Sequence, residues 1–384
     1  MDGEEYSVLL YSPGFQFLQA LDHVASCTYS RGQNDAGEIE LTVPDGYYNP
    51  ALFVPFNIVL IQRTIPGLAP YIDLQTPWFL LDGPTYSLDA GGVQLVTFRG
   101  TDAVGLILAS RNVAYNDYNS YTYKLAAADN MLKAVVRENA GSLATDTSRN
   151  LTNSGFTVAA DVAAGPIIRM GSFARQPMLQ VLQDIATASA NNATTPTWLG
   201  FDVTLANMLT GALEFTTYTG QRGVDHRQTV GTPPVILSPE AGNLADVEVG
   251  NLYRNSVSFM YVAGAGVADI RAIATASSAA LIALSPYGRR EGFTDGSQIV
   301  DPAALTTLAA GKLYEQRPRK YFTGRIVQTN NTLRGVHWDY GDYLTATYRN
   351  QTYDVRVDKI AVKLSAAENG GLLEDVTAYL RSDT

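Results

Sequence analysis

The segment GEIELTVPDG, residues 37–46, decides the fold class. Its apolar residues Ile39, Leu41 and Val43 alternate with polar ones, which places them on one face of an extended strand. The Pro-Asp-Gly sequence that follows is typical of a turn. Runs of the same kind occupy residues 57–63, 78–88 and 93–100. Short strands separated by Gly, Pro and Asp predict an antiparallel β-barrel over residues 1–110.

The composition indicates a large protein that is rich in strands. The chain has 384 residues, more than the roughly 100 to 200 of one domain, so we expect two or more packed units. Hydrophobic residues make up 46% and charged residues 17%, which supplies enough apolar side chain for a sizeable buried interior. The 33 glycines and 22 tyrosines favour turns and strands. We therefore expect a mainly β fold with α insertions.

Helical periodicity appears in the middle of the chain. Within residues 123–141 and again within 172–190, apolar residues recur every three or four positions, which is the spacing of one helical face. These residues are Leu125, Leu132, Val135 and Val136 in the first segment and Met178, Val181, Leu182 and Ile185 in the second. We expect an inserted α+β domain over residues 111–197.

A third helix is predicted just after residue 300. Asp301 is a favourable N-cap, Pro302 suits the first helical position, and Pro318 ends the segment. The apolar residues between them are Leu305, Leu308 and Leu313. This helix indicates a helical insertion over residues 266–319.

Further strand-like segments predict a second β-barrel. They occupy residues 198–205, 212–220, 247–253, 255–264, 343–349, 353–364 and 375–380. We assign residues 198–265 and 320–384 to this barrel. Its last three strands follow the same order as the runs from 57 to 100, with Asp82 and Asp358 in matching places. We interpret this likeness as a duplication, which makes the two antiparallel barrels related, and the alternative is a chance similarity between two β-meanders.

Charge and cysteine content exclude several classes of protein. The net charge is -10 and no stretch concentrates Lys or Arg, so specific nucleic-acid binding is not expected. A single cysteine, Cys27, excludes an intrachain disulfide and fits synthesis in a reducing cytoplasm. The first residues lack a basic segment followed by an apolar run, and no window approaches the roughly 18 apolar residues of a membrane span.

The sequence carries no recognisable catalytic or metal-binding pattern. The histidines are His23, His226 and His337, and His337 has Asp339 and Asp342 near it, which raises the question of a metal site. Zinc-type spacings, EF-hand loops, nucleophile turns and phosphate-binding loops are all absent from the sequence. We predict that the histidines are surface or turn residues and that there are no catalytic, cofactor-binding or metal-binding residues. Carboxylate pairs for glycoside cleavage stay open, because 37 acidic residues offer many pairs.

Several segments resemble one viral family. They are SRGQNDAGEIELTVPDGYYNPALFVPFNIVLIQR (30–63), SPYGRREGF (285–293), the helix from Asp301, WDYGDYLTATY (338–348) and YDVRVDKI (353–360). In this order they resemble siphovirus tail hub proteins, the baseplate hub family of tailed bacteriophages. The resemblance covers most of the chain apart from residues 140–200.

The resemblance implies a structural role in the virion. Such hubs have two β-barrels per chain, and a homotrimer forms a ring of six barrels that caps the hexameric tail tube. The implied partners are the tail tube or a distal tail protein, the tape-measure protein, and tip, fibre or spike proteins. The implied role is to join the tube to the distal tip at host attachment and to let DNA pass at ejection. An acidic chain suits such a channel, because like charge keeps the phosphate backbone off its wall.

Two rival functions remain open from the residues. One is a tail-associated hydrolase of cell wall or polysaccharide. The other is a carbohydrate-binding module used in adsorption, since 22 tyrosines and three tryptophans offer aromatic faces that can stack on sugars. The non-enzymatic hub is our prediction.

Overall fold

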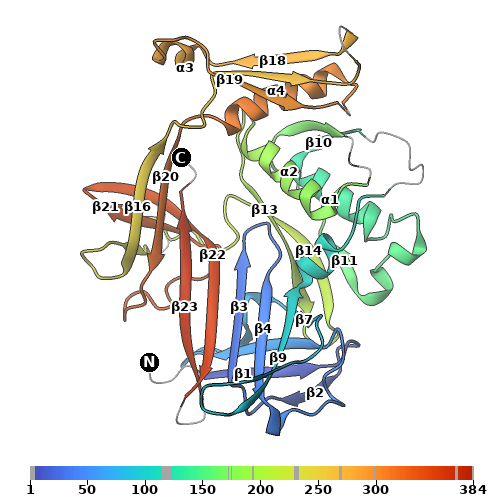
Figure 1. The fold of residues 1–384 in the computed structure, drawn as a ribbon, viewed down its shortest axis with the longest axis vertical. Helices are drawn as coiled ribbons and strands as arrows, with labels where there is room; N and C mark the ends of the chain where they lie inside the picture. Colours follow the sequence, from blue (N-terminus) through green and yellow to red (C-terminus); the bar gives the residue numbers. More distant parts are fainter. Residues whose placement is uncertain are drawn as a thin grey trace.

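Strands from the two ends of the chain lie side by side at the centre of the molecule. The computed structural model describes residues 5–114, 123–171, 173, 175–192, 194–228, 233–267, 270–297, 299–367 and 371–382. In Figure 1 the N-terminal strands lie beside the C-terminal strands, while the inserted segments gather at the other end of the long axis. The fold is mainly β, as expected.

Most strands belong to one 15-stranded sheet. Its path is β16-β20-β23-β22-β3-β4-β9-β7-β5-β1-β2, and β6, β8, β15 and β21 pair alongside this path. The N-terminal strands are β1 (Glu5–Tyr11), β2 (Phe17–Ala20), β3 (Ser26–Gly32), β4 (Glu38–Pro44), β5 (Ile58–Thr64), β6 (Tyr71–Ile72), β7 (Trp78–Leu80), β8 (Thr85–Leu88) and β9 (Gln94–Asp102). The later strands are β15 (Ile236–Leu237), β16 (Leu244–Leu252), β20 (Arg319–Ile326), β21 (Tyr343–Tyr348), β22 (Gln351–Ala366) and β23 (Leu372–Arg381).

The strand predicted within residues 37–46 is confirmed as β4. Ile39, Leu41 and Val43 are all buried, as the alternation requires. They belong to a core that also contains Trp78 from the N-terminal strands and Leu364 from β22. One hydrophobic core therefore serves strands from both ends of the chain.

The long hairpin β22–β23 joins the two halves of the sheet. The first part of β22 pairs with β21, its last part from Lys359 pairs with β3, and β23 runs along its other edge. Two closed barrels were expected, but the pairing path of the described strands is open and no closed barrel is found in it. The physical reason is that β3 offers its edge to β22, so the sheet continues from one half into the other.

The predicted inserted α+β unit contains both expected helices. Its elements are β10 (Tyr123–Ala127), α1 (Ala128–Asn139), β11 (Phe156–Val158), β12 (Ile167–Gly171) and α2 (Met178–Ala190). Leu132, Val135 and Val136 are buried on the inner face of α1. Leu125 differs from the prediction, because it lies in β10 and exposes 65% of its surface.

Three strands expected in the second barrel pair elsewhere. Strands β13 (Leu199–Asn207) and β14 (Ala212–Thr219) form a three-stranded sheet with β11. Strand β17 (Phe259–Ala263) pairs with β18 (Ile273–Ser277) and β19 (Glu291–Asp295). Alternation in a sequence indicates a strand but carries no information about its partner, which explains the difference. The division of the whole chain into domains stays a prediction.

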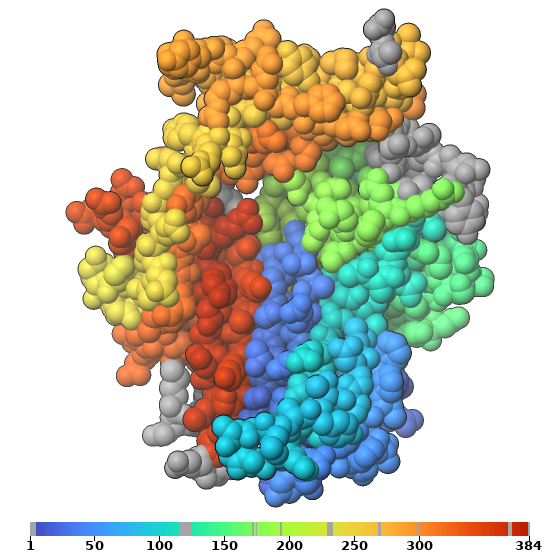
Figure 2. All heavy atoms as spheres, in the orientation of Figure 1, coloured from blue at the N-terminus to red at the C-terminus, as the bar shows by residue number. Residues whose placement is uncertain are grey.

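A small sheet and two helices form the far end of the molecule. Helix α4 (Pro302–Glu315) is confirmed, and Asp301 caps it by accepting the backbone N–H of Ala304 at 3.0 Å. Leu305 of α4 packs with Met260 and Val262 under the small sheet. Helix α3 (Ala279–Leu284) lies between β18 and β19. Figure 2 shows this part as a separate cap above the central sheet.

Candidate functional site: a buried ionic junction and two free sheet edges

A strained turn lies where the N-terminal and C-terminal halves meet. Leu74 and Gln75 have φ values of 54° and 52°, in the left-handed region that non-glycine residues rarely adopt. The Leu74 carbonyl accepts hydrogen bonds from Arg31 Nη1 at 3.2 Å, Arg222 Nη2 at 3.3 Å and Thr76 Oγ1 at 2.9 Å. Backbone strain of about 1–3 kcal/mol per residue persists only where the surroundings enforce it. Three donors on one carbonyl provide that enforcement.

Asp73, just before this turn, is the centre of a buried charge network. Its carboxylate accepts hydrogen bonds from Tyr29 Oη and from Arg334 Nη2, both at 2.5 Å. Arg334 also contacts Glu374 Oε1 at 3.0 Å, and Arg63 contacts Glu374 Oε2 at 3.2 Å. Burial acts to raise the pKa of Asp73, but Arg334 and the hydrogen bonds outweigh it and lower that pKa. Asp73 is therefore a buried carboxylate whose charged form is stabilised by Arg334.

A second group of buried charges ties the inserted unit to the same turn. Arg31 of β3 pairs with Asp202 of β13 and lies 3.3 Å from Asp102 of β9. Arg222 Nε reaches the other oxygen of Asp202 at 2.8 Å. Burial raises the pKa of Asp102, against the opposing effect of Arg31. One carboxylate, Asp202, thus connects the small three-stranded sheet to β3 of the large sheet and to the segment that follows β14.

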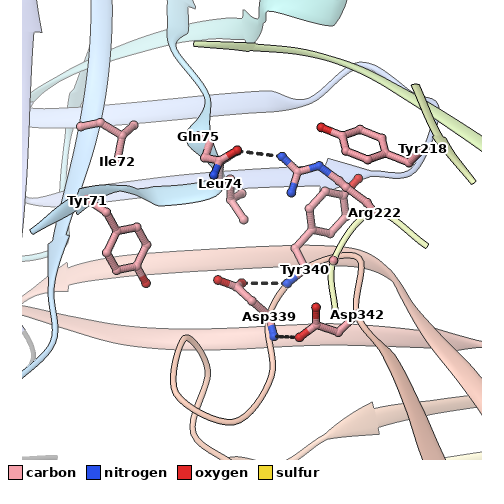
Figure 3. Close-up of a pocket in the computed structure, with 10 residues that line it drawn as sticks. Tyr71, Ile72, Leu74, Gln75, Tyr218, Arg222, Asp339, Tyr340 and Asp342 are labelled. Atoms are coloured by element: carbon pink, nitrogen blue, oxygen red, sulfur yellow. Dashed lines mark hydrogen bonds between the residues drawn. The ribbon is translucent and has the colours of Figure 1, made fainter. Parts of the chain in front are cut away.

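A pocket of about 250 Å³ opens beside this network. Figure 3 shows that its labelled side chains come from three separate segments. Arg222 lies over the rings of Tyr340 and Tyr218, at 5.2 and 5.7 Å from their centroids. The polar groups of Arg222, Asp339 and Asp342 are engaged with the protein itself. The arrangement fits a packed joint between segments.

The turn around Asp342 closes the third side of the pocket. Asp342 Oδ1 accepts the backbone N–H of Val224, and Oδ2 accepts that of Asp339, both at 2.6 Å. Gly341 has φ 87°, and its carbonyl accepts the N–H of Gly223 at 3.0 Å. A Cβ at Gly223 would lie 2.0 Å from Asp342 Oδ1. Burial raises the pKa of Asp342 to about 6. Two segments 118 residues apart therefore meet backbone to backbone.

The three histidines are not brought together. His23 is exposed and stacks on Tyr47, with 3.7 Å between the ring centroids. His337 lies in a turn, where its Nδ1 accepts the N–H of Leu333 at 3.0 Å. His226 is partly buried, and its Nε2 lies 3.8 Å from Asp342. Asp342 thus lies near His226, although His337 is closer to it in the sequence. No metal-binding cluster occurs among the described residues.

Sequence reasoning missed the ionic network. Arg31 follows the inward-facing Cys27 and Tyr29 in β3 at alternating positions, and Arg63 has the same inward position in β5. A charged residue at an inward position of an alternating strand was the available signal, since a buried charge requires a partner. The partners come from remote segments, so only the folded structure could identify them.

Several strands of the large sheet, β2 among them, have one free edge in the described part of the chain, and β8 and β16 carry two of these free edges. β8 pairs only with β9, and β16 pairs only with β20. Every residue of β8 is exposed, including Tyr86 at 64% and Leu88 at 66%. Unpaired strand edges with exposed apolar side chains are characteristic of surfaces that another chain covers.

The face of this sheet that is turned away from the core is polar. Opposed side chains form a row across the strands, and this row carries both signs of charge. It runs through Asp375, Lys363, Thr28, Glu40 and Arg99. Arg99 and Glu40 form an ion pair at 2.9 Å. Such a row suits a face in contact with water.

Comparisons with solved structures show a shared fold. A 43 kDa tail protein of prophage MuSo2 from Shewanella oneidensis is 11% identical, with a TM-score of 0.54 over 98% of each chain. The prophage tail protein gp18 from Listeria monocytogenes EGD-e is 10% identical, with a TM-score of 0.51 over 98% of this chain and 94% of that one. A chain of the Francisella PdpA-VgrG complex is 11% identical, with a TM-score of 0.53 over 100% of this chain and 53% of that one.

The family comparison covers nearly the whole sequence. No curated protein matches the chain. No helix in the described ranges is long and apolar enough to cross a membrane. The sequence model for siphovirus ReqiPepy6 Gp37-like proteins matches residues 7–372. The resemblance inferred from the sequence is thereby confirmed, and the chain belongs to the siphovirus ReqiPepy6 Gp37-like protein family.

Proposed function

We propose that the chain is a non-enzymatic structural protein of the virion, the hub of a phage tail tip or baseplate. Three copies form a ring with pseudo-sixfold symmetry that joins the tail tube to distal tip or fibre proteins and lets DNA pass. The family match and the fold shared with two prophage tail proteins support a place in the tail. The internal order of the strands supports the ring.

The strand order is the observation that carries this proposal. From the free edge of β16 to that of β8 the strands run β16-β20-β23-β22, then β3-β4-β9-β8, and every neighbouring pair on this path is antiparallel. A second branch leaves β9 through β7-β5-β1-β2. Each half supplies four strands to this path, and the joint between the halves is β22 against β3. If the halves are equivalent, β8 of one copy pairs with β16 of the next in the same way. Three copies then present six similar units around a closed ring.

A shared irregularity supports the equivalence of the halves. The N–H groups of Leu81 and Asp82 both donate to the Arg99 carbonyl, at 2.9 and 3.1 Å. In the other half, the pairing of β22 with β23 skips Asp358 between Val357 and Lys359. Two residues oppose one in both places, which is a β-bulge. The positions matched in the sequence, Asp82 and Asp358, thus both lie at bulges.

The polar face fits the wall of a channel. Its row of alternating charges has no excess of basic residues that would retain the phosphate backbone of DNA. We also propose a division in which residues 199–219 join the inserted α+β unit and residues 253–316 form the distal cap, because their strands pair there. The two halves of the large sheet remain as the related β domains.

Measurement of mass in solution tests the proposal. Sedimentation velocity of the purified chain is expected to show a species of three times 41.4 kDa, and averaged electron micrographs a ring with six similar lobes. A strict monomer at high concentration that also fails to bind purified tail-tube protein would contradict the hub. The rival hydrolase predicts clearing in a zymogram on cell wall, where we expect none.

A further inference from the structure

Helix α3 lacks a hydrophobic core of its own. The helix reads AALIAL, six apolar residues, and none of them is buried. Leu284 exposes 71% of its surface, and Tyr287 in the following turn exposes 95%. We call residues 278–290 the α3 arm. A six-residue helix made only of apolar residues gains little from folding in water, so its surface is suited to contact with another molecule.

The α3 arm is nevertheless held rigidly at its base. Its two ends bond to one residue, because Ser278 N–H donates to the Ser258 carbonyl at 2.9 Å and Ser258 N–H donates to the Arg290 carbonyl at 2.8 Å. The Ser278 hydroxyl caps α3 by accepting the N–H of Leu281. Arg289 lies over the ring of Phe259, 4.1 Å from its centroid. The exposed apolar residues are therefore presented in a defined position.

Contacts of Arg290 make the α3 arm continuous with the free edge strand β16. Arg290 Nη1 donates to the Tyr253 carbonyl at 2.7 Å, and Nη2 donates to that of Arg254. Tyr253 directly follows β16, and both it and Leu252 are more than half exposed. Figure 1 shows α3 and β16 on the same side of the molecule. One flank thus combines an unpaired strand edge with a line of exposed apolar side chains.

Charge favours another copy of this chain as the molecule that covers this flank. Arg254, Arg289 and Arg290 lie in or beside the α3 arm, whereas the whole chain has a net charge of -10. The α3 arm, residues 278–290, contains no acidic residue, so its charge is opposite in sign to the net charge of a second copy. A heterologous contact, in which one flank meets a different surface of the next copy, is also the kind that closes a ring.

We propose that the α3 arm clasps the neighbouring copy of this chain. The contact reinforces the β8–β16 joint from outside the sheet, with Leu284 and Tyr287 as its apolar anchors. This inference rests on the proposed ring and adds to it a specific second interface. It also explains why these two side chains are exposed in a single copy.

Photo-crosslinking of the full chain tests the contact directly. Tyr287→p-benzoylphenylalanine places the reactive group at a nearly fully exposed position, so the fold is preserved. Irradiation of the purified protein is expected to yield adducts of two chains, with crosslinked peptides from different copies. The matched control is the same substitution at Leu209, which exposes 91% of its surface in the turn between β13 and β14, and it is expected to yield no two-chain adduct.

A pair of serine variants gives the second readout. Leu284→Ser with Tyr287→Ser is expected to raise the concentration at which the trimer dissociates by about tenfold or more, the effect of losing interface anchors. Leu209→Ser is expected to leave that concentration unchanged. The clasp is refuted and the ring stands if the wild type is trimeric, the arm variant sediments like the wild type and no adduct forms. If the wild type is monomeric, the clasp and the ring both fail. Irradiation of virions that carry the photo-reactive chain gives a further test, in which adducts with a different tail protein alone would overturn the clasp.

Discussion

Substitution of Asp73 tests whether the ionic junction holds the two halves of the sheet together. Asp73→Asn keeps the size of the side chain but removes the negative charge opposite the fully buried Arg334. It also replaces one acceptor oxygen by an amide group, so either Tyr29 or Arg334 loses its acceptor on this side chain. Removing one member of a buried ion pair costs about 3–5 kcal/mol when the remaining charge is left unpaired. Arg334 keeps its contacts with Glu374 and Asp339, so we expect a loss near the lower end of that range.

Tryptophan fluorescence during denaturant unfolding measures this loss. Trp78 and Trp338 are both buried in the core next to the junction, so their emission reports its opening. The matched control is Glu40→Gln, which removes an exposed ion pair with Arg99 at 2.9 Å and is expected to cost at most about 1 kcal/mol. Equal small shifts for the two variants would refute the reasoning.

The double variant separates charge from packing. Asp73→Asn combined with Arg334→Met removes both charges, and we expect it to recover part of the lost free energy, because an apolar replacement leaves no unpaired ion. Acid acts in the same direction as Asp73→Asn. Since the pKa of Asp73 is lower in the folded protein, its stabilisation is present above the ordinary value of 3.8 and is lost as pH falls through the folded pKa.

Three further predictions concern the Asp342 turn and the sheet edge. Gly223→Ala places a Cβ 2.0 Å from Asp342 Oδ1, and we expect about 1–3 kcal/mol of destabilisation in thermal melts, whereas Gly46→Ala, with open space around it, should change little. The pKa of Asp342 rises from 3.8 to about 6 on folding, so its contribution to the free energy of unfolding is fully present below pH 3.8 and is lost, by about 3 kcal/mol, as pH rises through 6. Asp342→Asn should flatten this pH dependence, which denaturant titrations at pH 4 and 7 measure. Tyr86→Glu on β8 should shift sedimentation from trimer toward monomer with unchanged circular dichroism, and an unaltered trimer would count against the edge joint.

Local patterns predicted the elements well. The alternation in residues 37–46 identifies β4 because a strand repeats every two residues, and Asp301 with Pro302 marks the start of α4 because capping is a local interaction. Leu125 shows the limit of this reasoning. Its spacing fits the face of α1, yet it lies in β10, because pairing with β12 overrides a helical period that only a few residues support.

The candidate site was far less predictable. Asp339 and Asp342 drew attention as possible ligands beside His337, but Asp342 instead accepts two backbone N–H groups and faces His226. Asp202 and Arg31 had no sequence signature as partners, since 171 residues separate them. Ion pairs of this kind depend on which surfaces meet, and no local pattern encodes that.

The sequence by itself determined that this is a mainly β member of a siphovirus protein family with helices in its insertions, since strand period, turn residues and caps act over a few neighbours. Only the tertiary structure decided how the strands are partnered. It joined the halves through β22 and β3, moved β13, β14 and β17 into other sheets, and left one edge each of β8 and β16 free in the described ranges. The physical reason is that backbone hydrogen bonds between strands are the same for every sequence, so side-chain packing across the whole molecule selects the partner.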